Sequence, residues 1–177
     1  MSSTSLVQFP KLSTCNPKRY VDALRLPGIV VPNTAGDEKA VAGADPQVAP
    51  PFSSRRVQRG DLAVVYNPKT RIWKGAFLYD TGPRHLLGEG SLRLVLDLWN
   101  RPRAPISALD TNSLGLTETY TVLFPGTAER MGPGGTWSQE KIQKQASNLL
   151  QKWGGGTVKG GLDKLFACAR DYKAKYQ

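Results

Sequence analysis

The chain has 177 residues, of which 40% are hydrophobic, and its 24 Lys and Arg against 14 Asp and Glu give a formal net charge of +10. This length suits one domain with a sizeable core, and the apolar content excludes a fully disordered chain. The charge favours a polyanionic partner, which could be nucleic acid, anionic lipid or an anionic cell-wall polymer. We expect no membrane span and no secretory signal, because no run approaches the necessary roughly 20 apolar residues and the N-terminus lacks an apolar core.

The two cysteines, Cys15 and Cys168, are too few for a disulfide framework or a cysteine-rich metal site. Whether they pair with each other stays open at this point. The chain has a single histidine, His85, with no recognisable partners for a metal ion. We therefore expect neither a metal nor a cofactor.

The N-terminal third alternates between unpatterned and strand-like stretches. Residues 1–19 are polar, which predicts a flexible arm ahead of a single domain over 20–177. The β-branched run at 28–32, closed by a proline, predicts a strand. Residues 33–56 combine Gly, Ala, Pro, Asp and Ser without periodicity, which predicts a long loop.

The middle of the chain predicts a β-hairpin and a further strand. Residues 61–66 and 71–79 are rich in β-forming side chains and enclose the turn sequence Asn67–Thr70. Another such run, 117–124, ends at Pro125. The strands therefore fall mostly before residue 125.

Three amphipathic helices are predicted, one between the strands and two after them. The first helix can be capped by Ser91 and ends before Pro102. Its predicted apolar face comprises Leu92, Val95, Leu96 and Trp99. The second begins at Thr136 or Ser138 and runs through Lys152, with an apolar stripe formed by Ile142, Ala146, Leu149, Leu150 and Trp153. The last spans about 162–172, with Leu165, Phe166, Ala169 and Tyr172 directed inward.

This distribution of elements predicts an α+β fold. We expect a small six-stranded, double-psi-like β-barrel, with the C-terminal helices packed outside it.

Two acidic residues occupy conspicuous positions between the hairpin and the first helix. Asp80 follows an apolar run and precedes a Gly-Pro corner, and Glu89 stands between two glycines just before Ser91. Paired carboxylates near the end of a buried strand suit acid/base chemistry. Ordinary turn chemistry at Asp80 and first-turn helix chemistry at Glu89 are the alternatives.

The wider sequence around these acids resembles the core of the family 75 glycoside hydrolases, the fungal-type chitosanases, over Tyr20–Gly156. The residues that carry the resemblance are Gly60–Val65, Asp80–Pro83, Gly88–Ser91, Ile29–Pro32, Tyr120–Thr127, Trp137, Ile142 and Gly154–Gly155. The resemblance implies that Asp80 and Glu89 are the catalytic carboxylates and that the reaction inverts the anomeric configuration.

An inverting glycosidase needs one protonated carboxyl group and one ionised carboxylate. Burial at the end of a strand is expected to raise the pKa of Asp80, which makes Asp80 the candidate acid. The helix start favours the ionised form of Glu89, which makes Glu89 the candidate base.

Five further residues are candidates for substrate binding. Thr81 and Ser91 can position water or sugar hydroxyls, although helix capping is the simpler role for Ser91. His85 can contact substrate or tune Asp80, or it is merely an exposed loop residue. Trp73 and Trp137 are candidate sugar-stacking platforms, whereas Trp99 and Trp153 fall on apolar helix stripes.

The sequence thus predicts an endo-acting, inverting hydrolase of β-1,4-linked amino-sugar polymers. Chitosan is a polycation that a +10 protein repels, so the charge favours peptidoglycan. We expect action outside the cytoplasm through a delivery route other than a signal peptide, as for an antibacterial effector with an immunity protein or for a phage enzyme.

Two alternatives stay open. A lytic transglycosylase on a similar barrel would also carry an Asp-Thr-Gly string near its catalytic acid. A noncatalytic basic module could bind nucleic acid or wall polymer, although no nucleic-acid-binding motif is present and we expect no nucleic-acid partner.

Overall fold

The computed structural model of the chain describes residues 13, 21–32, 57–82, 89–101, 118–128 and 137–176. Four strands and three helices lie in these ranges: β1 (Gly28–Pro32), β2 (Leu62–Asn67), β3 (Ile72–Gly82), α1 (Leu92–Leu98), β4 (Tyr120–Phe124), α3 (Gln139–Trp153) and α4 (Val158–Tyr176). Apart from residue 13, the predicted arm at 1–19 lies outside the described ranges. The predicted loop at 33–56 lies outside them as well. In the described ranges, no helix has both the length and the apolarity to cross a membrane.

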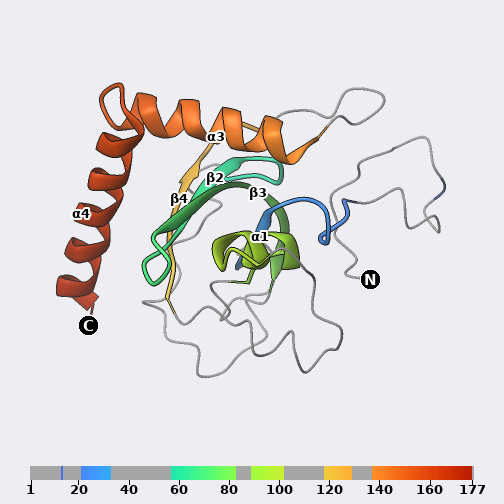
Figure 1. Cartoon of the computed structure of the whole chain (residues 1–177), viewed down its shortest axis with the longest axis horizontal. Coiled ribbons are helices and arrows are strands. Elements are labelled where there is room, and N and C mark those ends of the chain that lie inside the picture. The colour runs from blue at the N-terminus through green and yellow to red at the C-terminus, as the bar shows by residue number, and fades with distance from the viewer. Residues whose placement is uncertain are drawn as a thin grey trace.

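The strands form one open, mixed sheet in the order β1-β3-β2-β4 (Figure 1). β1 runs parallel to β3, whereas β2 is antiparallel to both β3 and β4. The predicted α+β class is confirmed. The predicted closed, six-stranded barrel is not seen in the described part of the chain, which forms four strands without closure.

The predicted hairpin is confirmed, but its second strand is longer than the sequence indicated. β3 continues to Gly82 rather than ending at residue 79. The additional residues pair with β1, as Val30 with Asp80 and Val31 with Thr81. Asp80 therefore lies within a strand and not in a corner after it, because pairing with a distant strand overrides the local Gly-Pro turn signal.

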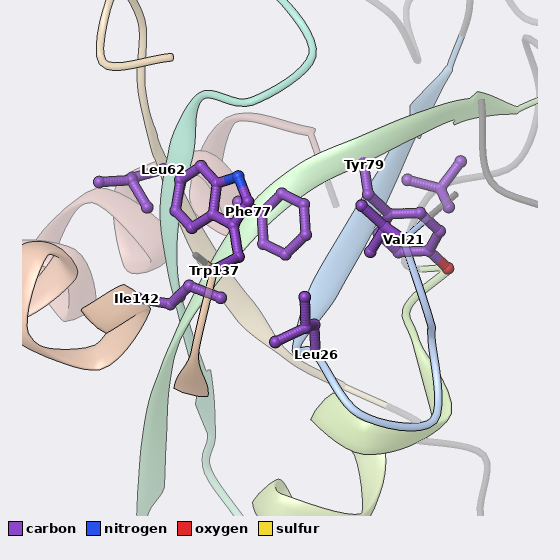
Figure 2. Packing of buried hydrophobic residues seen from close by; sticks show 8 residues of the cluster. Val21, Leu26, Leu62, Phe77, Tyr79, Trp137 and Ile142 are labelled. Atoms are coloured by element: carbon purple, nitrogen blue, oxygen red, sulfur yellow. The ribbon is translucent and has the colours of Figure 1, made fainter. Parts of the chain in front are cut away.

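One face of the sheet is covered by α3, which begins after the cap residue Ser138 as predicted. At the contact, Gly75 of β3 brings the sheet so close to α3 that an added Cβ atom would lie 2.7 Å from Cβ of Ala146. Beside this contact, the rings of Phe77 and Trp137 stack with their centroids 5.1 Å apart, at the centre of the cluster drawn in Figure 2.

The other face of the sheet is covered by α1. Leu94 and Leu98 of this helix pack against Ile29, Ala63 and Leu78. The predicted apolar face of α1 is therefore mostly wrong, because of its members only Leu96 is fully buried. Nearly every position of the helix except Arg93 and Asp97 is apolar, so periodicity admits more than one stripe. The buried residues are Leu94, Leu96 and Leu98.

The C-terminal helix α4 begins at Val158, four residues earlier than predicted, and runs along the outside of the sheet near β4 (Figure 1). Glycines at 160 and 161 argue against a helix by propensity. Here they allow close packing, because a Cβ atom on Gly161 would lie 2.5 Å from the carbonyl oxygen of Leu150. Leu165 is buried as predicted, but Tyr172 is exposed, which corrects its predicted inward position.

Candidate active site

Asp80 and Glu89 lie on opposite sides of β1, and Val30 stands between them. Val30 pairs with Asp80 in the β1–β3 ladder. On its other edge, the Val30 N–H donates a hydrogen bond of 2.9 Å to the Glu89 carbonyl oxygen. Neighbouring strands are about 4.8 Å apart, so the two backbones are held roughly 10 Å apart by one intervening strand.

The residues 89–91 behave as a short strand along the outer edge of β1. Gly90 forms an antiparallel bridge with Ile29, and the Ser91 N–H donates a 2.8 Å hydrogen bond to the Gly28 carbonyl oxygen. The Gly-Glu-Gly-Ser sequence therefore does more than open helix α1. It also fixes the backbone of Glu89 to the sheet.

A β-bulge sets the direction of Asp80. The pairs Gly28–Phe77 and Ile29–Leu78 are followed by Val30–Asp80, so Tyr79 is an extra residue in β3. Strict alternation would put Asp80 on the face opposite Tyr79, whereas the bulge makes Asp80 a partner of Val30. Paired residues project to the same face, so Asp80 and Glu89 both belong to the face on which Val30 and Tyr79 are buried.

Ser91 anchors the Glu89 segment through a fully used hydroxyl group. Its Oγ donates to the Leu26 carbonyl oxygen and accepts from the N–H groups of Gly28 and Leu94, at 2.9, 2.8 and 3.2 Å. The residue is only 1% exposed. One donor and two acceptor sites are all that a serine hydroxyl offers. The predicted capping role is confirmed, and the same hydroxyl ties α1 to β1.

Tyr79 directly precedes Asp80 in β3 and was not singled out from the sequence. Its side chain is 5% exposed, and its ring contacts the backbone of Gly28 so closely that a Cβ atom there would lie 1.9 Å from Cδ1. Burial, followed by the charges of Glu89 and then Asp80, raises the pKa of Tyr79 from 10.0 to about 12. The phenol is thus neutral at ordinary pH, and both carboxylates lie within electrostatic reach of it.

We expect Gly28→Ala to destabilise the fold by about 1–3 kcal/mol, since the new methyl group overlaps the Tyr79 ring and overpacking costs this much. Urea denaturation measures the change. Gly90→Ala is the matched control on the neighbouring segment, because its Cβ would meet nothing closer than 3.4 Å. Equal stability of the two variants would contradict the tight contact between Gly28 and Tyr79.

The buried phenol also predicts an alkaline loss of stability. Unfolded tyrosine loses its proton near pH 10, whereas folded Tyr79 keeps its proton up to a pKa of about 12. Between these values the unfolded state binds fewer protons, so stability falls as the pH rises, by about 2–3 kcal/mol above pH 12. Tyr79→Phe lacks this contribution, so in urea denaturation the stability of the parent relative to the variant should fall between about pH 10 and about pH 12. A constant difference would contradict the prediction.

The structure places two of the next three predicted substrate-binding residues, Thr81 and Trp73, but not His85. The backbone of Thr81 pairs with Val31, one position beyond Asp80, and His85 lies outside the described residues. Trp73 is half-buried against the cluster of Val64, Ala146 and Leu150.

Trp137 has a role in the core. It is 8% exposed, with Phe77 stacked on its ring and the Lys141 Nζ 5.8 Å from the ring centroid. Aromatic residues that bind sugars present an open face, which this packing does not offer.

Asp61 is a buried carboxylate that serves the fold. It is 0% exposed and accepts hydrogen bonds from the N–H groups of Gln58, Thr127 and Ala128. These contacts join the start of β2 to the segment after β4. In the sequence, the only indication of this structural role was the position of Asp61 between Gly60 and the apolar run that begins at Leu62.

Within the described ranges, no group of three or more His, Cys, Asp or Glu residues is placed to hold a metal ion. Cys168 is exposed and forms no disulfide with another described residue. Cys15 lies outside the described ranges, so the structure does not describe whether the two cysteines pair.

Comparison with protein-family models and with curated proteins finds no match for this chain. The resemblance to the family 75 glycoside hydrolases therefore stays a prediction based on the residues quoted above.

Proposed function

We propose that the protein is an endo-acting, inverting glycoside hydrolase that cleaves β-1,4 bonds of an amino-sugar polymer. The observation that carries the proposal is the position of Asp80 and Glu89 on either side of Val30, with both residues on one face of the sheet. Two acids that are nine positions apart in the sequence are separated in space by a strand from elsewhere in the chain.

The spacing supports inversion over retention. Carboxyl groups of retaining enzymes are about 5–5.5 Å apart, whereas those of inverting enzymes are about 6.5–9.5 Å apart to admit water. Backbones roughly 10 Å apart suit the second range, because both side chains project to the same face and can lean toward a sugar between them.

In the proposed reaction, Asp80 donates its proton to the glycosidic oxygen as the bond to the anomeric carbon breaks. A water molecule attacks that carbon from the opposite side, and Glu89 accepts the proton that the water loses. Glu89 is exposed, which gives its carboxylate access to water, and Asp80 is half-buried in β3. Proton exchange with solvent then restores both groups.

The strand-like segment 89–91 extends the sheet beyond β1, as a six-stranded, double-psi-like barrel would require. The net charge of +10 favours peptidoglycan, an acidic polymer, over chitosan. We further propose that the protein acts on bacterial cell walls outside the cytoplasm, as an effector restrained by an immunity protein or as a phage enzyme.

Digestion of purified peptidoglycan and of chitosan side by side tests the proposal. We expect new reducing ends whose first-formed anomer is inverted, as observed by NMR and mass analysis. Products with anhydro ends would instead identify a lytic transglycosylase. Failure to cleave either polymer, together with salt-sensitive DNA binding, would identify a noncatalytic basic module and overturn the proposal.

A further inference from the structure

Tyr79 is a buried polar group that the proposed reaction does not use. Its ring packs in the cluster with Phe77, at a centroid distance of 6.3 Å, and against the Gly28 backbone. In Figure 2 the ring lies at the margin of this cluster, with its oxygen directed away from Phe77 and Trp137. A phenol held in this way has little freedom to turn.

The bulge places Tyr79 next to Asp80 at the same position along β1. Because Tyr79 and Asp80 together oppose the single residue Val30, the phenol and the Asp80 carboxyl group leave the strand at adjacent positions. Glu89 opposes the same valine from the other edge of β1. Backbone pairing thus places three ionisable residues from two segments next to Val30.

The charges that act on the phenol come from these same neighbours. Glu89 contributes more than Asp80, and both act in the same direction as burial. A neutral tyrosine hydroxyl is a hydrogen-bond donor at every pH at which a glycosidase works. Its natural acceptor in this setting is an ionised carboxylate, because such bonds are stronger than those between neutral groups.

We propose that Tyr79 is a positioning residue whose hydroxyl donates a hydrogen bond to the Glu89 carboxylate, directly or through one water molecule, and so holds this base ionised and oriented. This inference rests on the proposed function for its catalytic meaning, but the interaction can be measured without any substrate. A donor to the ionised form lowers the pKa of a carboxyl group, so removing the donor raises it.

The test is the titration of Glu89 by carbon NMR in the parent protein and in Tyr79→Phe, which keeps the ring and loses only the hydroxyl. We expect the midpoint of Glu89 to rise by about one pKa unit in the variant, the size expected for a hydrogen bond to a charged group. Asp80 is titrated in parallel, because its charge also acts on the phenol. Tyr66→Phe is the matched control, since Tyr66 of β2 packs with Tyr120 and Phe166 instead.

An unchanged Glu89 midpoint in folded Tyr79→Phe overturns the inference. On a polymer that the parent cleaves, the variant should also show a lower kcat with little change in KM, and the acid limb of its pH profile should move to higher pH. If the parent cleaves no glycan, the proposed function fails, and the titration still decides whether Tyr79 positions Glu89.

Discussion

Replacing either acid by its amide should abolish glycan cleavage while leaving the protein folded. Asp80→Asn removes the proton donor and Glu89→Gln removes the base, and general acid–base groups each contribute about 10²–10⁴-fold to rate. Neither substitution changes side-chain shape, and both residues lie at or near the surface of the sheet. Initial rates of peptidoglycan or chitosan cleavage, with circular dichroism to verify folding, measure the effect.

The structure offers matched controls for this experiment. Glu140→Gln and Asp163→Asn remove the same charges from exposed positions on α3 and α4. The Asp163 ion pair with Lys159 is exposed and should contribute little to stability. Activity that falls equally in all four variants would show that net charge matters rather than a catalytic pair. Full activity of both Asp80→Asn and Glu89→Gln would remove the two residues from the mechanism.

The Glu89→Gln variant also tests whether the protein acts on bacterial cell walls. Production of the parent in the bacterial periplasm should lyse cells if peptidoglycan is the substrate, and production of Glu89→Gln should not. Equal lysis by both proteins would mean that the toxicity has another cause.

Ser91→Ala should be the most destabilising of the single substitutions considered. It removes three hydrogen bonds and leaves the Gly28 N–H and the Leu26 carbonyl group buried without this partner. An unsatisfied buried group costs about 1–3 kcal/mol, so the expected loss is about 2–5 kcal/mol in the free energy of unfolding. Urea denaturation with a circular-dichroism signal measures it.

Ser138→Ala provides the comparison, because the Ser138 hydroxyl caps α3 at an exposed position by accepting a single hydrogen bond from the Lys141 N–H. Loss of such a cap costs about 1 kcal/mol. A loss of similar size in both variants would mean that Ser91 is only a helix cap. In variants that remain folded, Ser91→Ala should also reduce glycan cleavage, because the Glu89 backbone is fixed next to this serine, whereas Ser138→Ala should not.

Local sequence patterns predicted most of the individual elements. The hairpin, the strand at 28–32 and the caps at Ser91 and Ser138 are all encoded within a few residues of themselves, by turn chemistry and by side-chain oxygens near helix starts. Each of these patterns depends only on residues that are close together in the sequence, so the element can be predicted from the sequence alone.

Features that depend on distant segments were not predictable. The extension of β3 to Gly82 comes from its pairing with β1, and the early start of α4 comes from the contact of Gly161 with Leu150. The bulge at Tyr79 has no local signature. Asp80 and Glu89 could be predicted as a pair from their glycine-rich surroundings. The position of β1 between them and the burial of Tyr79 next to Asp80 could not be predicted.

The parallel pairing of β1 with β3 has a consequence for the order in which the protein folds. The hairpin of β2 and β3 closes through a short turn, whereas β1 must join the sheet across roughly 50 residues. Closing a long loop costs entropy before any contact compensates for it, so long-range parallel pairing is slow. The hairpin should thus form early and β1 should dock late. Because β1 is the spacer between Asp80 and Glu89, a folding chain acquires its acid pair only in that late step, and stopped-flow refolding should show glycan cleavage appearing after the hairpin signal.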